Sequence, residues 1–169
     1  QISLWQVSQK IKELFFKNVI VKSMMYGYFT YPINGEGMSF YKDGIKFECK
    51  QCGNCCNISG YVFVFREDLN RILELTDYTM EELQQTYLST VDGYTVFRDK
   101  GDQACIFWDP AIKGCKIYEA RPTQCRTYPF WKTLLYKKNQ WEKEKGSCPG
   151  IGLGKLFSSE EIEELKQKM

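Results

Sequence analysis

Histidine is absent from this 169-residue chain. Without an imidazole side chain, zinc sites that mix cysteine with histidine and histidine-bound iron are both excluded. Conventional hydrolase chemistry is disfavoured as well, because no histidine can act as a base and no serine stands in a nucleophile-elbow pattern. A bound transition metal would therefore be held by thiolates, with carboxylates as the other available ligands.

The chain also has no large excess of positive or negative charge, and it has no long apolar run. Its 23 basic and 21 acidic residues leave a net charge of +2, which is too small to indicate nucleic-acid binding. No apolar run approaches the length of a membrane span, and no signal peptide is recognisable. We therefore expect no transmembrane segment and a cytoplasmic location.

Cysteine, by contrast, is abundant. Four of the eight cysteines fall in one short stretch, Cys49-Lys-Gln-Cys52-Gly-Asn-Cys55-Cys56. Two-residue gaps let the backbone turn so that successive sulfurs point inward, as a metal ion or an iron–sulfur cluster requires. Disulfides are the alternative, but adjacent Cys55 and Cys56 would then need different distant partners. We predict that all eight are metal ligands: Cys49, Cys52, Cys55, Cys56, Cys105, Cys115, Cys125 and Cys148.

The order of the cysteines favours iron–sulfur over zinc. Three closely spaced cysteines followed by a remote Cys148-Pro149 are similar to the ligand order of [4Fe–4S] ferredoxins. Zinc sites more often use two separated C-x2-C pairs, and no second pair occurs here, so zinc is the alternative metal. Two centres fit the count, and one cluster with four spare thiols stays open. We predict one site made by Cys49, Cys52, Cys55 and Cys148, and another made by Cys56, Cys105, Cys115 and Cys125.

The remaining pattern predicts an α+β fold of small antiparallel hairpins and short helices around this cysteine centre, with flanking N- and C-terminal helices. We divide the chain into three parts. Residues 1–46 hold an amphipathic helix (residues 2–20) and an aromatic-rich extension, residues 47–154 form the cysteine domain, and residues 155–169 form a C-terminal helix. A helix is predicted over 67–75, and a second one begins at the Thr79 capping box and ends at about Tyr87. A brief helical turn begins at Arg121-Pro122 and presents Cys125, and a last helix begins at the Ser158 capping box. Predicted hairpins pair 94–98 with 104–108 and 130–136 with 141–145, and short strands are predicted before Cys49, at 61–65 and from Cys115 to Tyr118.

Two arginines flank Cys125. Arg121 and Arg126 could neutralise an anionic thiolate–metal centre or bind a carboxylate or phosphate group, which makes them candidate cofactor-binding residues. Each could equally pair with an acid such as Asp109 or Glu119. The sequence leaves both interpretations open.

The cysteines and their neighbours also match a known pattern. The matching segments are Phe47-x-Cys49-x2-Cys52-x2-Cys55-Cys56, Cys105-x-Phe107, Gly114-Cys115-x-Ile117-Tyr118-x2-Arg121-Pro122-x2-Cys125-Arg126-x-Tyr128-Pro129-Phe130 and Cys148-Pro149-Gly150. Over residues 47–154 the chain resembles the CxxCxxCC, or YkgJ-like, family, described as zinc- or iron-chelating. A related branch, flagellin lysine N-methylase, looks like an iron–sulfur protein that methylates protein lysines. That branch implies lysine methylation, S-adenosylmethionine as a cofactor and a protein substrate as candidates.

We therefore expect a metal-binding cysteine-cluster protein whose iron–sulfur centre acts in redox chemistry or protein modification. The alternative is a protein-interaction module held by structural zinc, with the aromatic N-terminal region as its binding surface. Nothing in the sequence assigns catalytic residues.

Overall fold

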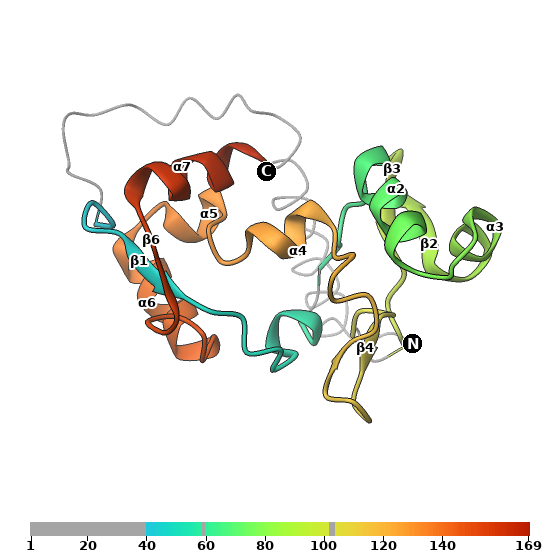
Figure 1. Cartoon of the computed structure of the whole chain (residues 1–169), viewed down its shortest axis with the longest axis horizontal. Coiled ribbons are helices and arrows are strands. Elements are labelled where there is room, and N and C mark those ends of the chain that lie inside the picture. The colour runs from blue at the N-terminus through green and yellow to red at the C-terminus, as the bar shows by residue number, and fades with distance from the viewer. Residues whose placement is uncertain (1–39, 59, 102–103) are drawn as a thin grey trace, which may run out of the picture. The chain divides into compact units, whose positions relative to one another are not determined.

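The computed structural model describes residues 40–58, 60–101 and 104–169, which belong to one of the two units into which the chain divides, residues 39–169 (Figure 1). The predicted helix over residues 2–20 and the aromatic extension as far as residue 39 lie outside these ranges, and the predicted domain boundaries stay a prediction. The described fold is α+β, as predicted, with short strand pairs and short helices.

The strands of the described chain form short antiparallel pairs. The pairs are β1 (Ile45–Phe47) with β6 (Lys155–Phe157), β2 (Leu88–Val91) with β3 (Tyr94–Phe97), and β4 (Trp108–Asp109) with β5 (Gly114–Cys115). In register, Lys46 lies opposite Leu156, Ser89 opposite Val96, and Trp108 opposite Cys115. The β1–β6 pair confirms the strand predicted just before Cys49.

The β2–β3 hairpin corrects the predicted pairing of 94–98 with 104–108. Asp92 and Gly93 turn with φ values of 50° and 82°, and two positive φ values are typical of the tight turn that joins neighbouring strands. β3 therefore pairs with the strand before it, and the later segment contributes an isolated bridge between Asp99 and Cys105. The strand predicted at 61–65 is reduced to a bridge between Phe63 and Val96.

Several predicted helices are present. They are α2 (Arg66–Leu75), α3 (Met80–Glu82) with its π-helical continuation η2 (Leu83–Tyr87), α4 (Thr123–Thr127) and α7 (Ser159–Gln167). Capping boxes begin two of them. The Thr79 N–H donates to Glu82 at 2.8 Å, and the Glu82 N–H donates to the Thr79 hydroxyl at 3.2 Å. Ser158 and Glu161 form the same reciprocal pair at the start of α7.

The predicted hairpin of 130–136 with 141–145 is wrong. Helices α5 (Lys132–Leu135) and α6 (Lys138–Ser147) occupy this segment. Trp141 is the buried residue of α6, and most of the others are Lys, Glu, Gln and Asn on an exposed surface. Lysine, glutamate and glutamine are good helix formers, but one buried residue leaves too little periodicity to reveal the helix.

Two hydrophobic cores lie in the described unit. The first core contains Val64, Ile72, Leu83, Leu88, Phe97, Phe107, Ile117 and Ala120, and the second contains Tyr41, Phe130, Leu135, Trp141, Cys148, Ile151 and Ile162. Figure 1 shows α4 between the elements of the first core, among them α2, β2 and β3, and those of the second, among them β1, α6 and α7. None of the described helices is long and apolar enough to cross a membrane.

The α7 capping box gives a stability prediction. Ser158→Ala removes the hydroxyl that accepts the Glu161 N–H and should lower the free energy of unfolding by about 1 kcal/mol. Hydrogen bonds from Lys155 and from the Ser158 N–H lower the pKa of Glu161. The contribution of this carboxylate to stability is therefore fully present above pH ~4.3, the ordinary pKa of glutamate. It is lost as the pH falls through the lower pKa that Glu161 has in the folded protein.

Ser159→Ala is the matched control, because the Ser159 hydroxyl donates to the neighbouring Glu160 outside the capping box. It should change stability by less than about 0.5 kcal/mol. Urea unfolding measures the free energy of unfolding of both variants. Equal losses of stability would contradict a specific contribution of the capping hydroxyl.

Candidate metal centre

The cysteine-rich stretch forms a tight loop that ends in a 3-10 turn, η1 (Asn54–Cys56). Gln51 and Gly53 adopt positive φ values of 52° and 80°, which reverse the chain between successive cysteines. The Cys56 N–H donates to the Gly53 carbonyl at 2.9 Å. The Asn54 side-chain amide donates to the Ser147 carbonyl at 2.7 Å, so the loop is fixed to the end of α6 immediately before Cys148.

Trp108 packs over this loop at Gly53. A Cβ built on Gly53 would overlap the indole ring, so the ring fills the space that a side chain would need. Gly53 therefore serves two purposes, a left-handed backbone and close approach of an aromatic ring. Since Trp108 pairs with Cys115 across β4–β5, this contact also places Cys115 beside the cysteine loop.

The other cysteines reach the loop from separate segments. The Cys105 N–H donates to the Cys56 carbonyl at 2.7 Å, which joins the turn before β4 directly to the loop. Cys115 ends β5, and Cys125 lies in α4. Both Cys105 and Cys115 also pack against the first core.

Buried polar groups hold α4 in place, and sequence reasoning missed them. Asp68, which is 1% exposed, accepts from the Thr123 N–H at 2.7 Å and the Thr123 hydroxyl at 2.8 Å. The buried Gln124 side chain accepts from the Phe63 N–H at 2.9 Å and donates to the Tyr61 carbonyl at 3.0 Å. Because unmet buried polar groups are costly, these bonds fix the orientation of the helix that carries Cys125.

Five thiols are close enough to affect one another's ionisation, and we call them the thiol cluster: Cys55, Cys56, Cys105, Cys115 and Cys125. The Cys55 and Cys56 sulfurs are 4.0 Å apart. Their hydrogen bond lowers the pKa of Cys55 to about 7 and raises that of Cys56. Burial raises the pKa values of the other three, that of Cys115 to about 11, and neighbouring cluster thiolates raise them further. Cys55 raises the pKa of each of the other four thiols.

Arg121 faces the thiol cluster. Its guanidinium lies 3.6 Å from the centre of the Tyr118 ring, and its Nε donates to the Tyr118 carbonyl at 2.6 Å. Its Nη1 lies 3.7 Å from the Cys49 sulfur. The positive charge also lowers the pKa of Cys55, and it lowers those of Cys115 and Cys125 against the larger effect of burial. Arg121 is thus a fixed cation beside both the cysteine loop and α4.

Arg126 is oriented differently. Its Nε donates to the Arg121 carbonyl at 3.1 Å, and its Nη2 donates to the Thr123 hydroxyl at 3.2 Å. Asp109, one of the acids considered as a partner, binds Lys116 at 3.5 Å instead. The two arginines that flank Cys125 therefore have different surroundings.

The remaining three cysteines have different surroundings. Cys49 contacts Arg121, Cys52 is exposed, and Cys148 is buried in the second core. All eight are free thiols. Within the described ranges, no three Cys, Asp or Glu side chains stand in ready-made ligand geometry. The donor chemistry fits a thiophilic metal, and the sulfurs would have to move closer together to bind it.

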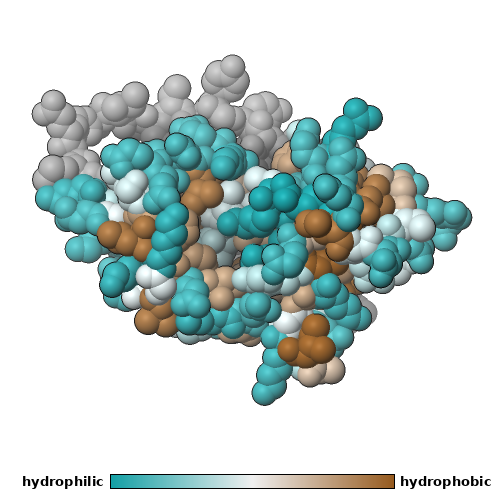
Figure 2. All heavy atoms as spheres, viewed as in Figure 1, coloured by the Kyte–Doolittle hydropathy of each residue, from teal (hydrophilic) through white to brown (hydrophobic). Residues whose placement is uncertain are grey.

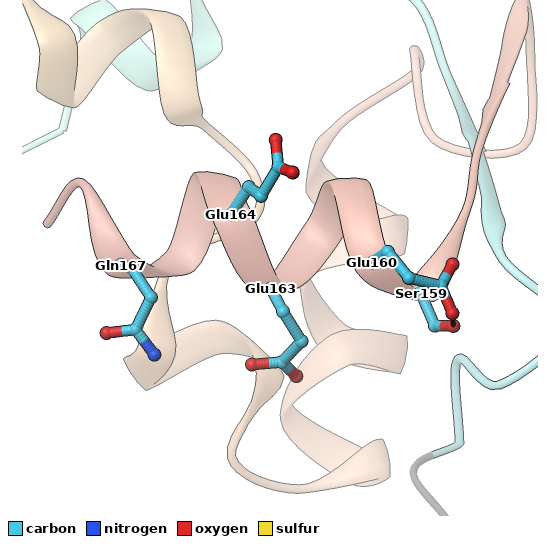
Figure 3. A pocket seen from close by; sticks show the side chains of 5 residues that line it. All are labelled: Ser159, Glu160, Glu163, Glu164 and Gln167. Carbon is cyan, nitrogen blue, oxygen red and sulfur yellow. Dashed lines mark hydrogen bonds between the residues drawn. The ribbon is translucent and has the colours of Figure 1, made fainter.

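A shallow hollow elsewhere, on α7, is lined by Ser159, Glu160, Glu163, Glu164 and Gln167 (Figure 3). Figure 3 shows Glu164 pointing away from Glu163 and Gln167, so these carboxylates do not converge. Glu163 also binds Lys166 at 2.6 Å and Tyr41 at 2.6 Å. The hollow is therefore a solvated helix face.

Comparison with known proteins agrees with this chemistry. Residues 48–149 match the CxxCxxCC family, whose description is "Putative zinc- or iron-chelating domain". The match covers more than half of the chain, so the chain belongs to this family, and the assignment supports the binding of zinc or iron. MJ0661, an uncharacterized protein of Methanocaldococcus jannaschii, is 33% identical over 90 residues, 53% of this chain and 48% of that protein. The chain thus spans about half the length of this curated relative. No solved structure matches.

The contact of Trp108 with Gly53 leads to a second prediction. Gly53→Ala should lower the free energy of unfolding by about 1–2 kcal/mol for the left-handed backbone and by a further 1–3 kcal/mol, roughly, for the overlap with the ring. Gly93→Ala is the control, because Gly93 has a φ of 82° and no atom within 4 Å of its added Cβ.

Urea unfolding of the two variants separates the backbone cost from the packing cost. We expect Gly53→Ala to lose clearly more stability than Gly93→Ala. Equal losses would contradict close packing of Trp108 on the cysteine loop.

Proposed function

We propose that the thiol cluster, with the adjoining cysteines, holds an iron–sulfur centre that serves redox chemistry or protein modification. One observation carries the proposal: thiols from four separate segments come within electrostatic reach of one another beside a single guanidinium. Packing alone does not account for five weakly polar thiols at one place, whereas metal binding does.

Cys105, Cys115 and Cys125 are the proposed ligands from outside the loop. Cys55 and Cys56 are the proposed ligands from the loop, and Cys55 is placed here because it interacts with every other cluster thiol. This differs from the grouping expected from spacing, which put Cys55 with Cys49, Cys52 and Cys148. Those three would complete a second centre or remain as spare thiols. A bound cluster would supply one-electron transfer at this position.

Arg121 is the proposed counter-charge. Four thiolates around Zn²⁺ carry a net charge of −2, and a thiolate-bound iron–sulfur cluster is likewise anionic, so a nearby guanidinium stabilises either centre. Stacking on Tyr118 and a hydrogen bond to its carbonyl hold the guanidinium in place. The side chain would keep this position before and after metal binding.

Exposure at one edge of the centre supports a role beyond architecture. Cys52 and Cys55 are exposed, whereas Cys105, Cys115 and Cys125 are partly buried. A centre with one open side can exchange electrons or groups with a partner, and solvent exposure is one of the factors that set a cluster's potential. A purely structural zinc site is more often closed.

Structural zinc in a protein-interaction module is the second candidate, and a separate observation favours it. Cys105 and Cys115 pack against the first core, whereas Cys148 belongs to the second. A metal bound by thiols on both sides would join two small cores into one folding unit. Lysine methylation and S-adenosylmethionine binding rest on the resemblance to the flagellin lysine N-methylase branch alone.

Metal and acid-labile sulfide content of protein purified without oxygen tests the proposal. We expect iron and sulfide in equal amounts, together with a brown colour. Cys125→Ser should lose most of the metal, because it removes a proposed ligand. Thr127→Ser is the control on the same helix, since it keeps the hydroxyl that donates to the Thr123 carbonyl.

Zinc without sulfide would reject the iron–sulfur assignment and favour the interaction module. Equal metal loss in both variants would contradict a specific role for Cys125 as a ligand, because a substitution that keeps every thiol would then do the same. Wild-type metal content in Cys125→Ser would contradict it directly.

A further inference from the structure

Cys55 and Cys56 are neighbours in the chain, and their side chains contact each other. The two sulfurs are 4.0 Å apart, and among the described residues this is the one hydrogen-bonded pair of thiols. Cys55 is exposed and Cys56 is half-buried, so a small molecule in solvent can reach the pair. Figure 2 shows hydrophilic side chains gathered over α4, the helix that carries Cys125, on the viewed face, so this side of the thiol cluster meets water. Thiols this close and this accessible can be oxidised to a disulfide.

Backbone contacts hold the pair in place. Both cysteines lie in η1, where the Cys56 N–H donates to the Gly53 carbonyl at 2.9 Å. The Cys56 carbonyl accepts the Cys105 N–H at 2.7 Å, and the Asn54 side chain binds the Ser147 carbonyl at the end of α6. None of these bonds uses a thiol, so they keep the two sulfurs near each other without a metal.

A disulfide between adjacent residues is strained. Consecutive Cα atoms are about 3.8 Å apart across a trans peptide, whereas the Cα atoms of disulfide-bonded residues are usually roughly 4.4–6.8 Å apart. The two sulfurs must also move from 4.0 Å to about 2.0 Å. Because strain makes a disulfide easier to reduce, strained and exposed disulfides are the labile or regulatory ones. Oxidation of this pair is therefore expected to be reversible.

We propose that Cys55 and Cys56 are a reversible oxidation site, which closes to a disulfide when a hydroperoxide oxidises the metal-free protein. Its effect on metal binding rests on the proposed function, because the closed pair removes two proposed ligands from the thiol cluster. Cys105, Cys115 and Cys125 are then too few for a four-thiolate centre. Oxidation therefore prevents metal uptake, and reduction restores it.

The chemical step balances with hydrogen peroxide as the oxidant. Cys55 reacts first because it is the more exposed of the two. Its sulfur attacks one peroxide oxygen, the O–O bond breaks, and the thiol proton leaves with the other oxygen as water, which gives a sulfenic acid. The Cys56 sulfur then attacks the Cys55 sulfur. The S–S bond forms as the S–O bond breaks, and hydroxide leaves with the Cys56 proton as a second water. Each sulfur loses one electron, and peroxide gains both.

Disulfide mapping of the full chain tests this site. The protein is purified without oxygen, freed of metal with a chelator, treated with hydrogen peroxide, alkylated with iodoacetamide and digested with trypsin. Digestion isolates Cys52, Cys55 and Cys56 in one peptide, residues 51–66. After oxidation we expect this peptide to lack two hydrogens and to carry one alkyl group, on Cys52. Treatment with excess glutathione before alkylation should reopen the pair, so that all three cysteines are alkylated.

Two variants separate this pair from its neighbour. Cys52→Ser is the matched control in the same loop, because it keeps the pair and removes the alternative disulfide from Cys52 to Cys55. It should form as much disulfide as the wild type. Cys56→Ser should form none and should leave Cys55 as a sulfenic acid, which dimedone traps.

A disulfide from Cys55 to Cys52, or one that joins this peptide to another part of the chain, would overturn the proposal. Alkylation of both Cys55 and Cys56 after peroxide treatment, or a sulfinic acid in place of the disulfide, would do the same.

Metal uptake is measured separately on the reduced and the oxidised protein, with zinc and with ferrous iron plus sulfide. Uptake by the reduced form alone would support the effect on metal binding, and equal uptake by both forms would contradict it. No uptake by either form would reject the proposed function and, with it, this effect. The disulfide map would still decide whether the oxidation site exists.

Discussion

The gathering of thiols around α4 is the constraint on which this structure depends. Sulfurs from the loop at η1, the turn before β4, strand β5 and helix α4 lie close enough for each to raise or lower the pKa of its neighbours. In the absence of metal, ionising one thiol opposes ionisation of the next, so a cation is needed to hold several thiolates together. Arg121 supplies one positive charge, and a metal centre would supply the rest.

The two cores explain why the position of this centre matters. Each core is a small set of apolar side chains, and α4 lies between the elements that form them (Figure 1). The helix is only five residues long, too short to be stable by itself. Asp68 and Gln124 bind it to the segments around the first core, while Trp131 donates to the Gln124 carbonyl at 2.9 Å from the other side. A metal bound to Cys125 would add a stronger link at the same point.

Local signals in the sequence predicted much of this arrangement. The spacing of the cysteines indicated a metal loop, and the pairs Thr79–Glu82 and Ser158–Glu161 located two helix starts, since capping is a short-range interaction. The β2–β3 hairpin had a signal too, because Asp92-Gly93 is a typical tight-turn pair, but the apolar segment 104–108 competed with β2 as the partner of β3. Long-range contacts were not predictable. Nothing near Asp68 in the sequence indicates that its partner is Thr123, and spacing alone grouped Cys55 with Cys52 although its neighbours in space are Cys105, Cys115 and Cys125.

X-ray absorption at the metal edge of the purified protein tests the central claim most directly, because it counts the ligand atoms and identifies their element. The account predicts a first shell made of sulfur alone, with four neighbours per metal at about 2.3 Å, since the chain has no histidine and its thiols converge. The result holds for either metal, and an iron–iron distance would additionally identify a cluster. A first shell dominated by nitrogen or oxygen at about 2.0–2.2 Å would contradict an all-cysteine centre.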